Sequence, residues 1–350
     1  MTMKPRIFIQ MGPGGVGKTT VSAAFGFYWA SQGKRVLVLT IDPSRRLAQA
    51  LGIQGQKGAA RVPFEGLKGE LHAMVLDHGE IFDSFVKMAA KKNPLVNKLL
   101  SNKLYIALKT QLQGSQDFTA LIELYHRARS GDYDVIVLDT PPAEHAWQFL
   151  EAPLRLMTLF QDKIAKWFRW IGDEDHTIWS RVISTGTRQV FKVLELLTGS
   201  EFIQQIGDFF KSIHYFQDQL RDQIKKSHDL LKDDQTEFTI VTTQDELKIL
   251  ESLEHAREIK SKGYHLRRVI MNRAWPEDGE TLHLEGFSEE QGLQIRKLLT
   301  LLSANQKTAI ELMSRWPQDV RVMKIYDTLK SSHDLEKLKE MSDDMMRAFE

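Results

Sequence analysis

The chain of 350 residues contains no cysteine. Disulfides, thiolate metal sites and iron–sulfur clusters are therefore excluded within it. No apolar run approaches the length of about 18 residues that a membrane-spanning helix needs, so we expect no transmembrane segment. The first six residues lead into a short apolar run without the long apolar region of a secretory signal. We therefore expect a cytoplasmic protein.

The sequence also has no excess of positive or negative charge. The sequence has 47 lysines and arginines against 46 aspartates and glutamates, a formal net charge of +1. This balance gives no general attraction to nucleic acid, and the sequence has neither a basic run nor a helix-turn-helix segment. We expect no nucleic-acid partner. With 42% hydrophobic residues, the chain can still bury a sizeable core.

Residues 12–20 carry the most informative pattern in the sequence. They read Gly-Pro-Gly-Gly-Val-Gly-Lys-Thr-Thr, which has the spacing GxxxxGK[ST] of a phosphate-binding loop, between an apolar run and a helical pattern. In such a loop the backbone N–H groups surround phosphate oxygens, the lysine reaches the β- and γ-phosphates, and the following threonine binds Mg²⁺. A glycine-rich turn without a ligand is the structural alternative. The expected nucleotide-binding residues are Gly12, Gly14, Gly15, Val16, Gly17, Lys18, Thr19 and Thr20.

Short runs rich in β-branched residues recur along the chain, with helical stretches between them. Near-continuous apolar runs are typical of strands buried on both faces. Their alternation with helices predicts an α/β fold with a doubly wound, mostly parallel sheet. The expected strands cover residues 7–11, 36–41, 71–76, 135–138, 238–242 and 269–271.

The spacing of apolar residues also predicts helical insertions within one domain, residues 1–350. From residue 146 to 231 we find no convincing strand, and apolar residues repeat at helical spacing. Four tryptophans at the start of this segment, Trp147, Trp167, Trp170 and Trp179, either bind a hydrophobic partner or pack between helices. We expect insertions at about 79–130 and 146–231, a nucleotide core of 1–78, 131–145 and 232–330, and a C-terminal helix at 333–349.

Two aspartates stand at the ends of predicted strands. Asp139 follows residues 135–138, where a carboxylate associated with Mg²⁺ belongs in a phosphoryl-transfer site. Asp42 follows residues 36–41 and is placed to position or polarise the attacking water. The structural alternative for Asp42 is a cap on the helix that begins after Pro43.

These motifs together resemble the ArsA-type P-loop ATPases. The segments that carry the likeness are the loop at 12–20, Ile41-Asp42-Pro43-Ser44, the stretch from Asp139 to His145, and Met271-Asn272-Arg273. The family contains the arsenical-pump ATPase and the ATPases that deliver tail-anchored membrane proteins, and the likeness covers nearly the whole chain. It implies an ATP hydrolase that uses Mg²⁺ and works as a nucleotide-driven switch. It further implies a homodimer or heterodimer, and a hydrophobic protein client on the helical subdomain.

The resemblance also implies roles for single residues. Asp42 is the water-positioning residue and acts with Lys18 in catalysis, while Asp139 begins a second switch that couples loss of the γ-phosphate to the helical subdomain. Asn272 reads the adenine edge, and Pro317 in the turn Trp316-Pro317 lies against the base. Without the family, Asn272 is equally explained as a turn residue that closes a strand.

The sequence departs from the family in two respects. Members usually carry a second lysine just after the first glycine, which in a nucleotide-bound homodimer reaches the partner's phosphates; here Pro13 has neither charge nor N–H. The alternatives are a weakly active or inactive subunit of a hetero-oligomer, a partner that supplies the lysine, or substitution by Arg45 or Arg46, which otherwise are exposed arginines at a helix start. The absence of cysteine removes both the zinc clasp of many targeting members and any site for arsenite, which prefers thiolates. We therefore reject arsenite transport.

Overall fold

The computed structural model consists of two compact units, which we describe separately. The sheet unit is Met1–Leu76, His126–Trp147 and Leu231–Glu350, and the helical unit is Asp77–Tyr125 and Gln148–Leu230. The structure describes residues 4–41, 46–56, 58–76, 78–90, 93, 95–113, 116–142, 150, 200–274, 288, 290–291, 293–294, 297, 309, 311–326 and 335–349.

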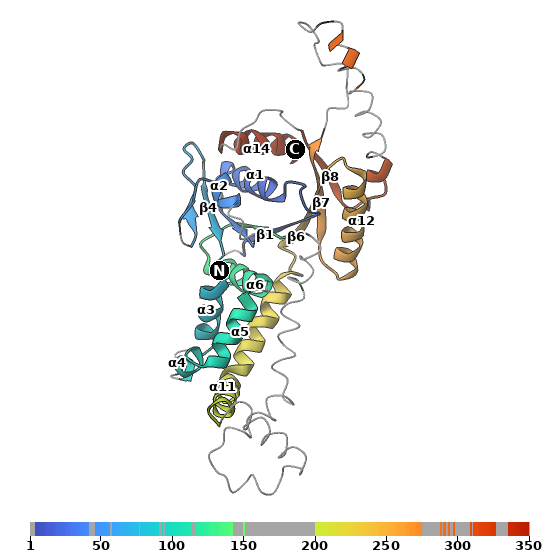
Figure 1. The fold of residues 1–350 in the computed structure, drawn as a ribbon. Coiled ribbons are helices and arrows are strands. Elements are labelled where there is room, and N and C mark those ends of the chain that lie inside the picture. Colours follow the sequence, from blue (N-terminus) through green and yellow to red (C-terminus); the bar gives the residue numbers. More distant parts are fainter. Residues whose placement is uncertain are drawn as a thin grey trace. The chain divides into compact units, whose positions relative to one another are not determined.

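An eight-stranded sheet forms the centre of the sheet unit, in the order β3-β4-β2-β5-β1-β6-β7-β8 (Figure 1). Neighbouring strands are parallel except for the antiparallel pair of β3 and β4, so the predicted doubly wound, mostly parallel α/β fold is confirmed. All six predicted strands are present, and β3 and β8 are additional. The strands are β1 (Arg6–Met11), β2 (Arg35–Thr40), β3 (Ala60–Arg61), β4 (Glu70–Val75), β5 (Val135–Asp139), β6 (Thr236–Thr242), β7 (Leu266–Ala274) and β8 (Arg321–Tyr326).

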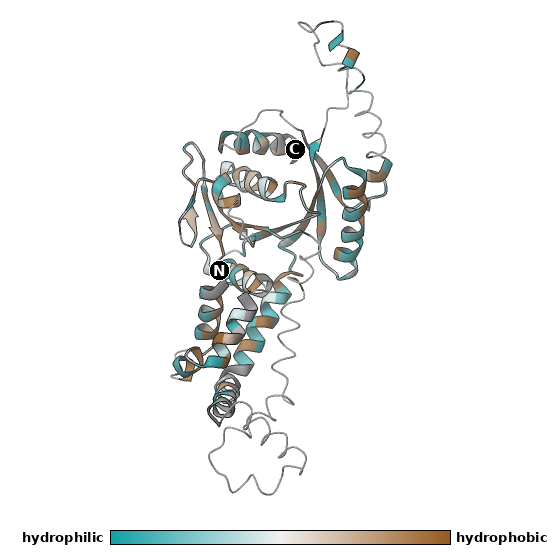
Figure 2. Ribbon diagram, viewed as in Figure 1, coloured by the Kyte–Doolittle hydropathy of each residue, from teal (hydrophilic) through white to brown (hydrophobic). Residues whose placement is uncertain are grey.

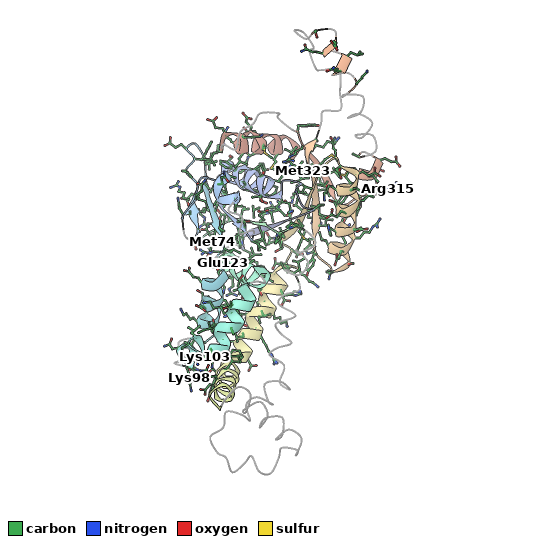
Figure 3. The ribbon with its side chains drawn as sticks, viewed as in Figure 1. Met74, Lys98, Lys103, Glu123, Arg315 and Met323 are labelled. Atoms are coloured by element: carbon green, nitrogen blue, oxygen red, sulfur yellow. The ribbon has the colours of Figure 1, made fainter. Side chains whose placement is uncertain are left out.

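One face of the sheet is covered by α1 (Lys18–Ser31), which packs against α14 (Leu335–Phe349). Phe8 of β1 meets Phe25 of α1 edge to face, with ring centroids 4.9 Å apart. Met323 of β8 (Figure 3) is buried in the same core as Met345 of α14. The helix that begins at the phosphate-binding loop is therefore held by apolar contacts from both the sheet and the last described helix.

Helix α12 (Glu246–Ser261) packs on β6 and β7. The side chain of Asp245 caps its first turn by accepting the N–H of Lys248 at 3.0 Å. Its buried residues include Ile249, Leu253 and Ala256, at the spacing of one helical face, and Figure 2 shows hydrophilic and hydrophobic residues interspersed along this helix. The capped, amphipathic sequence accounts for its position on the sheet.

The helical unit contains α3 (His78–Ala90), α4 (Leu95–Leu100), α5 (Lys103–Gln113) and α11 (Ser200–Leu230), and the boundary between the units falls within α6 (Gln116–Ser130). Helix α11 packs against α3, α4 and α5, and Phe209, Leu220 and Ile224 are buried on it. The four tryptophans of the second insertion lie outside the described residues. Of the helices that the structure describes, none is long and apolar enough to cross a membrane.

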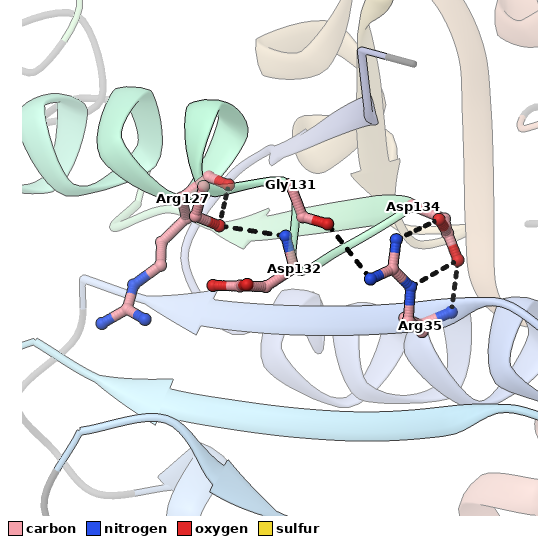
Figure 4. Close-up of polar contacts among 6 residues, drawn as sticks. Arg35, Arg127, Gly131, Asp132 and Asp134 are labelled. Atoms are coloured by element: carbon pink, nitrogen blue, oxygen red, sulfur yellow. Dashed lines mark hydrogen bonds and ion pairs between the residues drawn. The ribbon is translucent and has the colours of Figure 1, made fainter. Parts of the chain in front are cut away.

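The turn that leads into β5 is fixed to the start of β2 (Figure 4). Arg35 donates from its backbone N–H and its guanidinium to the Asp134 carboxylate, at 2.9 and 2.8 Å, and a further guanidinium N–H reaches the Gly131 carbonyl at 3.1 Å. The Arg35 hydrogen bond holds the pKa of Asp134 below its ordinary value. These contacts set where β5 begins, and so help to place Asp139 at its end.

A charged cluster lies across β1, β6 and β7, near their amino ends. Glu237 accepts a hydrogen bond from Arg6 at 2.7 Å and another from Arg268. The Arg6 guanidinium also lies 4.9 Å from the ring centroid of Trp29. Burial raises the pKa of the Glu237 carboxyl, but the hydrogen bonds and charges of Arg6 and Arg268 outweigh burial and hold that pKa below its ordinary value.

Gln10, next to the loop in β1, is fully buried, and neither its amide nitrogen nor its amide oxygen has a hydrogen-bond partner among the described residues. A buried polar group without a partner costs about 1–3 kcal/mol. We expect Gln10→Met to raise the free energy of unfolding by about 1 kcal/mol, measured by urea unfolding. A loss of stability would instead mean that an internal water satisfies the amide.

Candidate nucleotide site

The loop of residues 12–17 fits tightly between the ends of β6 and β7. A Cβ atom on Gly12 would stand 2.1 Å from the Val241 carbonyl oxygen, and one on Gly17 would stand 2.4 Å from the Asn272 Nδ2. Gly17 also has a φ of 87°, in the left-handed region that other residues rarely adopt. Both positions therefore require glycine, and the loop backbone is held in place from outside.

Lys18 begins α1 and lies along the loop, with only 8% of its surface exposed. Its Nζ donates to the carbonyl oxygens of Gly12 at 3.0 Å and Pro13 at 2.8 Å. Pro13 thus contributes an acceptor to the loop although it has no N–H. The first N–H groups of α1 have no partner within the helix, which makes this end of the helix favourable for phosphate.

Asp139, at the end of β5, is completely buried and accepts hydrogen bonds from side-chain hydroxyls. Thr19 donates to its Oδ2 at 2.8 Å, Thr40 of β2 to the same oxygen at 3.0 Å, and Ser22 of α1 to its Oδ1 at 3.4 Å. Thr40 and Asp139 are register neighbours on β2 and β5. The carboxylate predicted to be near Mg²⁺ therefore lies against the threonine predicted to bind it.

The next residue ties the following turn to β1. Thr140 donates from its hydroxyl to the Gln10 carbonyl at 2.7 Å. Gln10 lies two residues before Gly12, so the turn at 140–142 and the loop are anchored on the same strand. The rest of the predicted second switch, residues 143–145, lies outside the described residues.

A cavity of about 460 Å³ opens at this edge of the sheet. Its lining combines loop residues, the end of α2 (Arg46–Ala50), the turn after β5 and one arginine from β7. Glycine, threonine and lysine predominate on the loop side, as a polyphosphate group requires. The lining residues are Gly15, Gly17, Lys18, Thr19, Thr20, Gln49, Ala50, Thr140, Pro141, Pro142 and Arg273.

Asn272 and Pro317, the predicted adenine-binding residues, are both described but do not line this cavity. Asn272 is buried, and its Nδ2 donates to the Val16 carbonyl at 2.8 Å. One donor of the amide is thus used to hold the loop. Contact of either residue with adenine remains a prediction.

Other predicted positions fall outside the described part of the chain. Asp42 and Arg45 lie in the segment 42–45, and Arg46 begins α2 without a described side chain. Sequence reasoning did not single out Thr40, Ser22 or Arg273 for this site. A threonine at the end of the predicted second strand was the available signal for Thr40, because parallel strands end at one edge of the sheet.

The donor atoms fit Mg²⁺. A threonine hydroxyl and a carboxylate are hard oxygen ligands, and Mg²⁺ usually takes only one or two protein ligands and completes its shell with water and substrate phosphates. Among the residues that the structure describes, no cluster of three or more His, Cys, Asp or Glu side chains could hold a metal by itself. Thr19 and Asp139 would hold the ion only together with a phosphate ligand.

Comparison with known proteins gives matches over nearly the whole chain. The sequence model of the family described as anion-transporting ATPase matches residues 5–346. The chain is 26% identical over 307 residues to the putative arsenical pump-driving ATPase 1 of Aquifex aeolicus, covering 83% of this chain and 69% of that protein. It is 25% identical over 341 residues to the ATPase get3 of Aspergillus terreus and 24% identical over 340 residues to that of Aspergillus niger, each time covering 97% of this chain and 89% of the relative.

Proposed function

Because this chain belongs to the anion-transporting ATPase family, and is therefore a nucleotide-dependent ATP hydrolase, we propose that it acts as a Mg²⁺-ATP-driven conformational switch. The observation that carries the proposal is the 2.8 Å hydrogen bond between Thr19 and Asp139. It joins the end of the phosphate-binding loop to the last residue of β5, directly before the turn at 140–142. A change at the phosphates is thereby linked to that turn.

We assign the reaction to in-line attack of water on the γ-phosphate. Lys18 and the loop N–H groups hold the phosphates and stabilise the charge that develops on them. Thr19 and Asp139 would hold Mg²⁺, which supplies further compensation of phosphate charge. Asp42 positions the water in this proposal, on the strength of the family resemblance alone.

The output of the switch in this proposal is movement that begins at the turn after Asp139 and reaches the helical unit. Support comes from Thr140, whose hydroxyl bonds to the Gln10 carbonyl beside the loop. A hydrophobic protein client on the helical unit, a dimeric state and a cytoplasmic location belong to the same proposal. Arsenite transport does not, because the chain has no thiolate to bind arsenite.

Binding of a hydrophobic dye to the purified chain tests the switch. We expect the dye signal to differ between ADP and a non-hydrolysable ATP analogue, because the exposed apolar surface changes with nucleotide state. Thr19→Val, which keeps the shape of the side chain but removes its hydroxyl, should reduce this difference. An identical signal in both nucleotide states would contradict the switch, and client handling with it.

Pro13 favours a second candidate function, a weakly active subunit of a hetero-oligomer. The position that carries a lysine in the resembling ATPases has no cation here. Steady-state turnover of the isolated chain, compared with turnover in the presence of a copurifying partner, separates the two candidates. Appreciable turnover by the chain alone excludes the inactive-subunit function, whereas strong activation by the partner supports it.

A further inference from the structure

Arg273 has an unusual backbone conformation. Its φ is 55°, and it is the only residue other than glycine with a positive φ in the described part of the chain. A long side chain is uncommon in this left-handed region, where Asn and Asp are tolerated better. The pairing of β7 with β8 is irregular between Met271 and Ala274, on either side of this position. Such irregularities redirect side chains and occur often beside active sites.

The irregular backbone brings Arg273 to the nucleotide cavity. Arg273 lines the same cavity as Lys18, Thr19 and Thr20, although it is distant from them in sequence. The preceding residue, Asn272, is fixed to the loop by its hydrogen bond to the Val16 carbonyl. Because Arg273 directly follows this anchored residue, the position of its backbone relative to the loop is fixed.

The Arg273 side chain is exposed, and it forms no hydrogen bond or ion pair with any other described residue. Of the described residues that line the cavity, Lys18 and Arg273 are the two cations. The Lys18 ammonium already donates to the Gly12 and Pro13 carbonyls. Arg273 is thus a cation at the cavity whose donors are available to a ligand.

A turn alone does not account for arginine at this position. Glycine or asparagine would adopt the same φ at a lower conformational cost. The unfavourable conformation of arginine therefore points to a role for its guanidinium. A guanidinium has five donors in a planar arrangement that matches phosphate oxygens. Position 13 carries a lysine in the resembling ATPases but a proline here. A cation from β7 can therefore compensate phosphate charge that position 13 does not.

We infer that Arg273 binds the polyphosphate of the nucleotide and supplies, from within the same chain, a cation that position 13 lacks. The inference rests on the proposed nucleotide site and extends it to a residue outside the phosphate-binding loop. Its guanidinium stabilises the bound nucleotide through charge-assisted hydrogen bonds. The irregular end of β7 holds it at the cavity.

The test compares nucleotide binding by the full chain and by Arg273→Asn, Arg273→Lys and Lys18→Ala, using a fluorescent ADP and its displacement by ATP. Asparagine keeps the left-handed backbone accessible, so Arg273→Asn should fold at least as well as the parent by thermal unfolding without nucleotide. We expect it to weaken ATP and ADP binding by about tenfold or more and to make binding less sensitive to salt. Arg273→Lys should give a smaller loss, because it keeps the charge but not the planar donors.

Two outcomes would overturn the inference in distinguishable ways. Binding by Arg273→Asn at the parent's affinity, with Lys18→Ala impaired, would show that the nucleotide site exists and that Arg273 serves only the turn. Absence of binding to the parent chain, or equal binding by Lys18→Ala, would refute the nucleotide site itself and this inference with it.

Discussion

Lys18→Ala is expected to lower ATP turnover by about 10³, the largest effect of any single substitution in this chain. Lys18 lies at the junction of the loop and α1, and its Nζ is 3.0 Å from the Gly12 carbonyl and 2.8 Å from that of Pro13. Alanine removes the cation that compensates charge on the β- and γ-phosphates. It also leaves both loop carbonyls without this donor.

Nucleotide binding and turnover should be measured together for this variant. Alanine is a good helix former, so α1 should begin normally, and unfolding without nucleotide measures what the loss of the two loop hydrogen bonds costs. Lys34→Ala is the matched control, because Lys34 is an exposed lysine in the same unit that does not line the cavity. A Lys18→Ala protein that bound and hydrolysed ATP as the parent does would refute the proposed mechanism.

Glu237→Gln is expected to lower the free energy of unfolding by about 3 kcal/mol at neutral pH. The Glu237 side chain is 13% exposed and that of Arg268 is 12% exposed, so this ion pair is largely withdrawn from water. Without the carboxylate, the largely buried guanidinium of Arg268 has no compensating charge and lies near that of the half-exposed Arg6. The measurement is urea unfolding of both proteins at the same pH.

The effect should depend on pH in a defined direction. The folded-state pKa of Glu237 is below its ordinary value of 4.5, so its contribution to stability is fully present above pH 4.5 and is lost as the pH falls through the folded-state pKa. The difference between parent and Glu237→Gln should therefore shrink in acid. As a control, Asp343→Ala removes a half-exposed pair with Lys339 on α14 and should cost no more than about 0.5 kcal/mol. A pH-independent difference would contradict this account.

The sequence was informative where one local pattern determines the structure. The strands at the centre of the sheet are buried on both faces, and their apolar runs predicted all six of them. The missed strand β8 is an edge strand, in which Arg321 and Val322 are exposed while Met323 is buried, so its pattern is mixed. The two residues of β3 are too few to give a pattern at all.

The same distinction holds for the site. The loop and Asp139 were predicted from short motifs, and the hydrogen bond of Thr19 to Asp139 agrees with the expected pairing. Ser22 and Thr40 join this group only because α1, β2 and β5 meet in the fold. The place of Arg273 depends on a φ of 55° and an irregular strand end, which no spacing of residue types indicates.

The packing of α14 on α1 has a consequence for synthesis of the chain. The helix that carries Lys18 is made among the first residues, but Leu338, Met341 and Met345, which help to bury its apolar side, are among the last. At translation rates of about 5–20 residues per second, that side of α1 lacks its cover for tens of seconds. Until α14 leaves the ribosome and docks, the apolar side of α1 is therefore exposed to non-specific association.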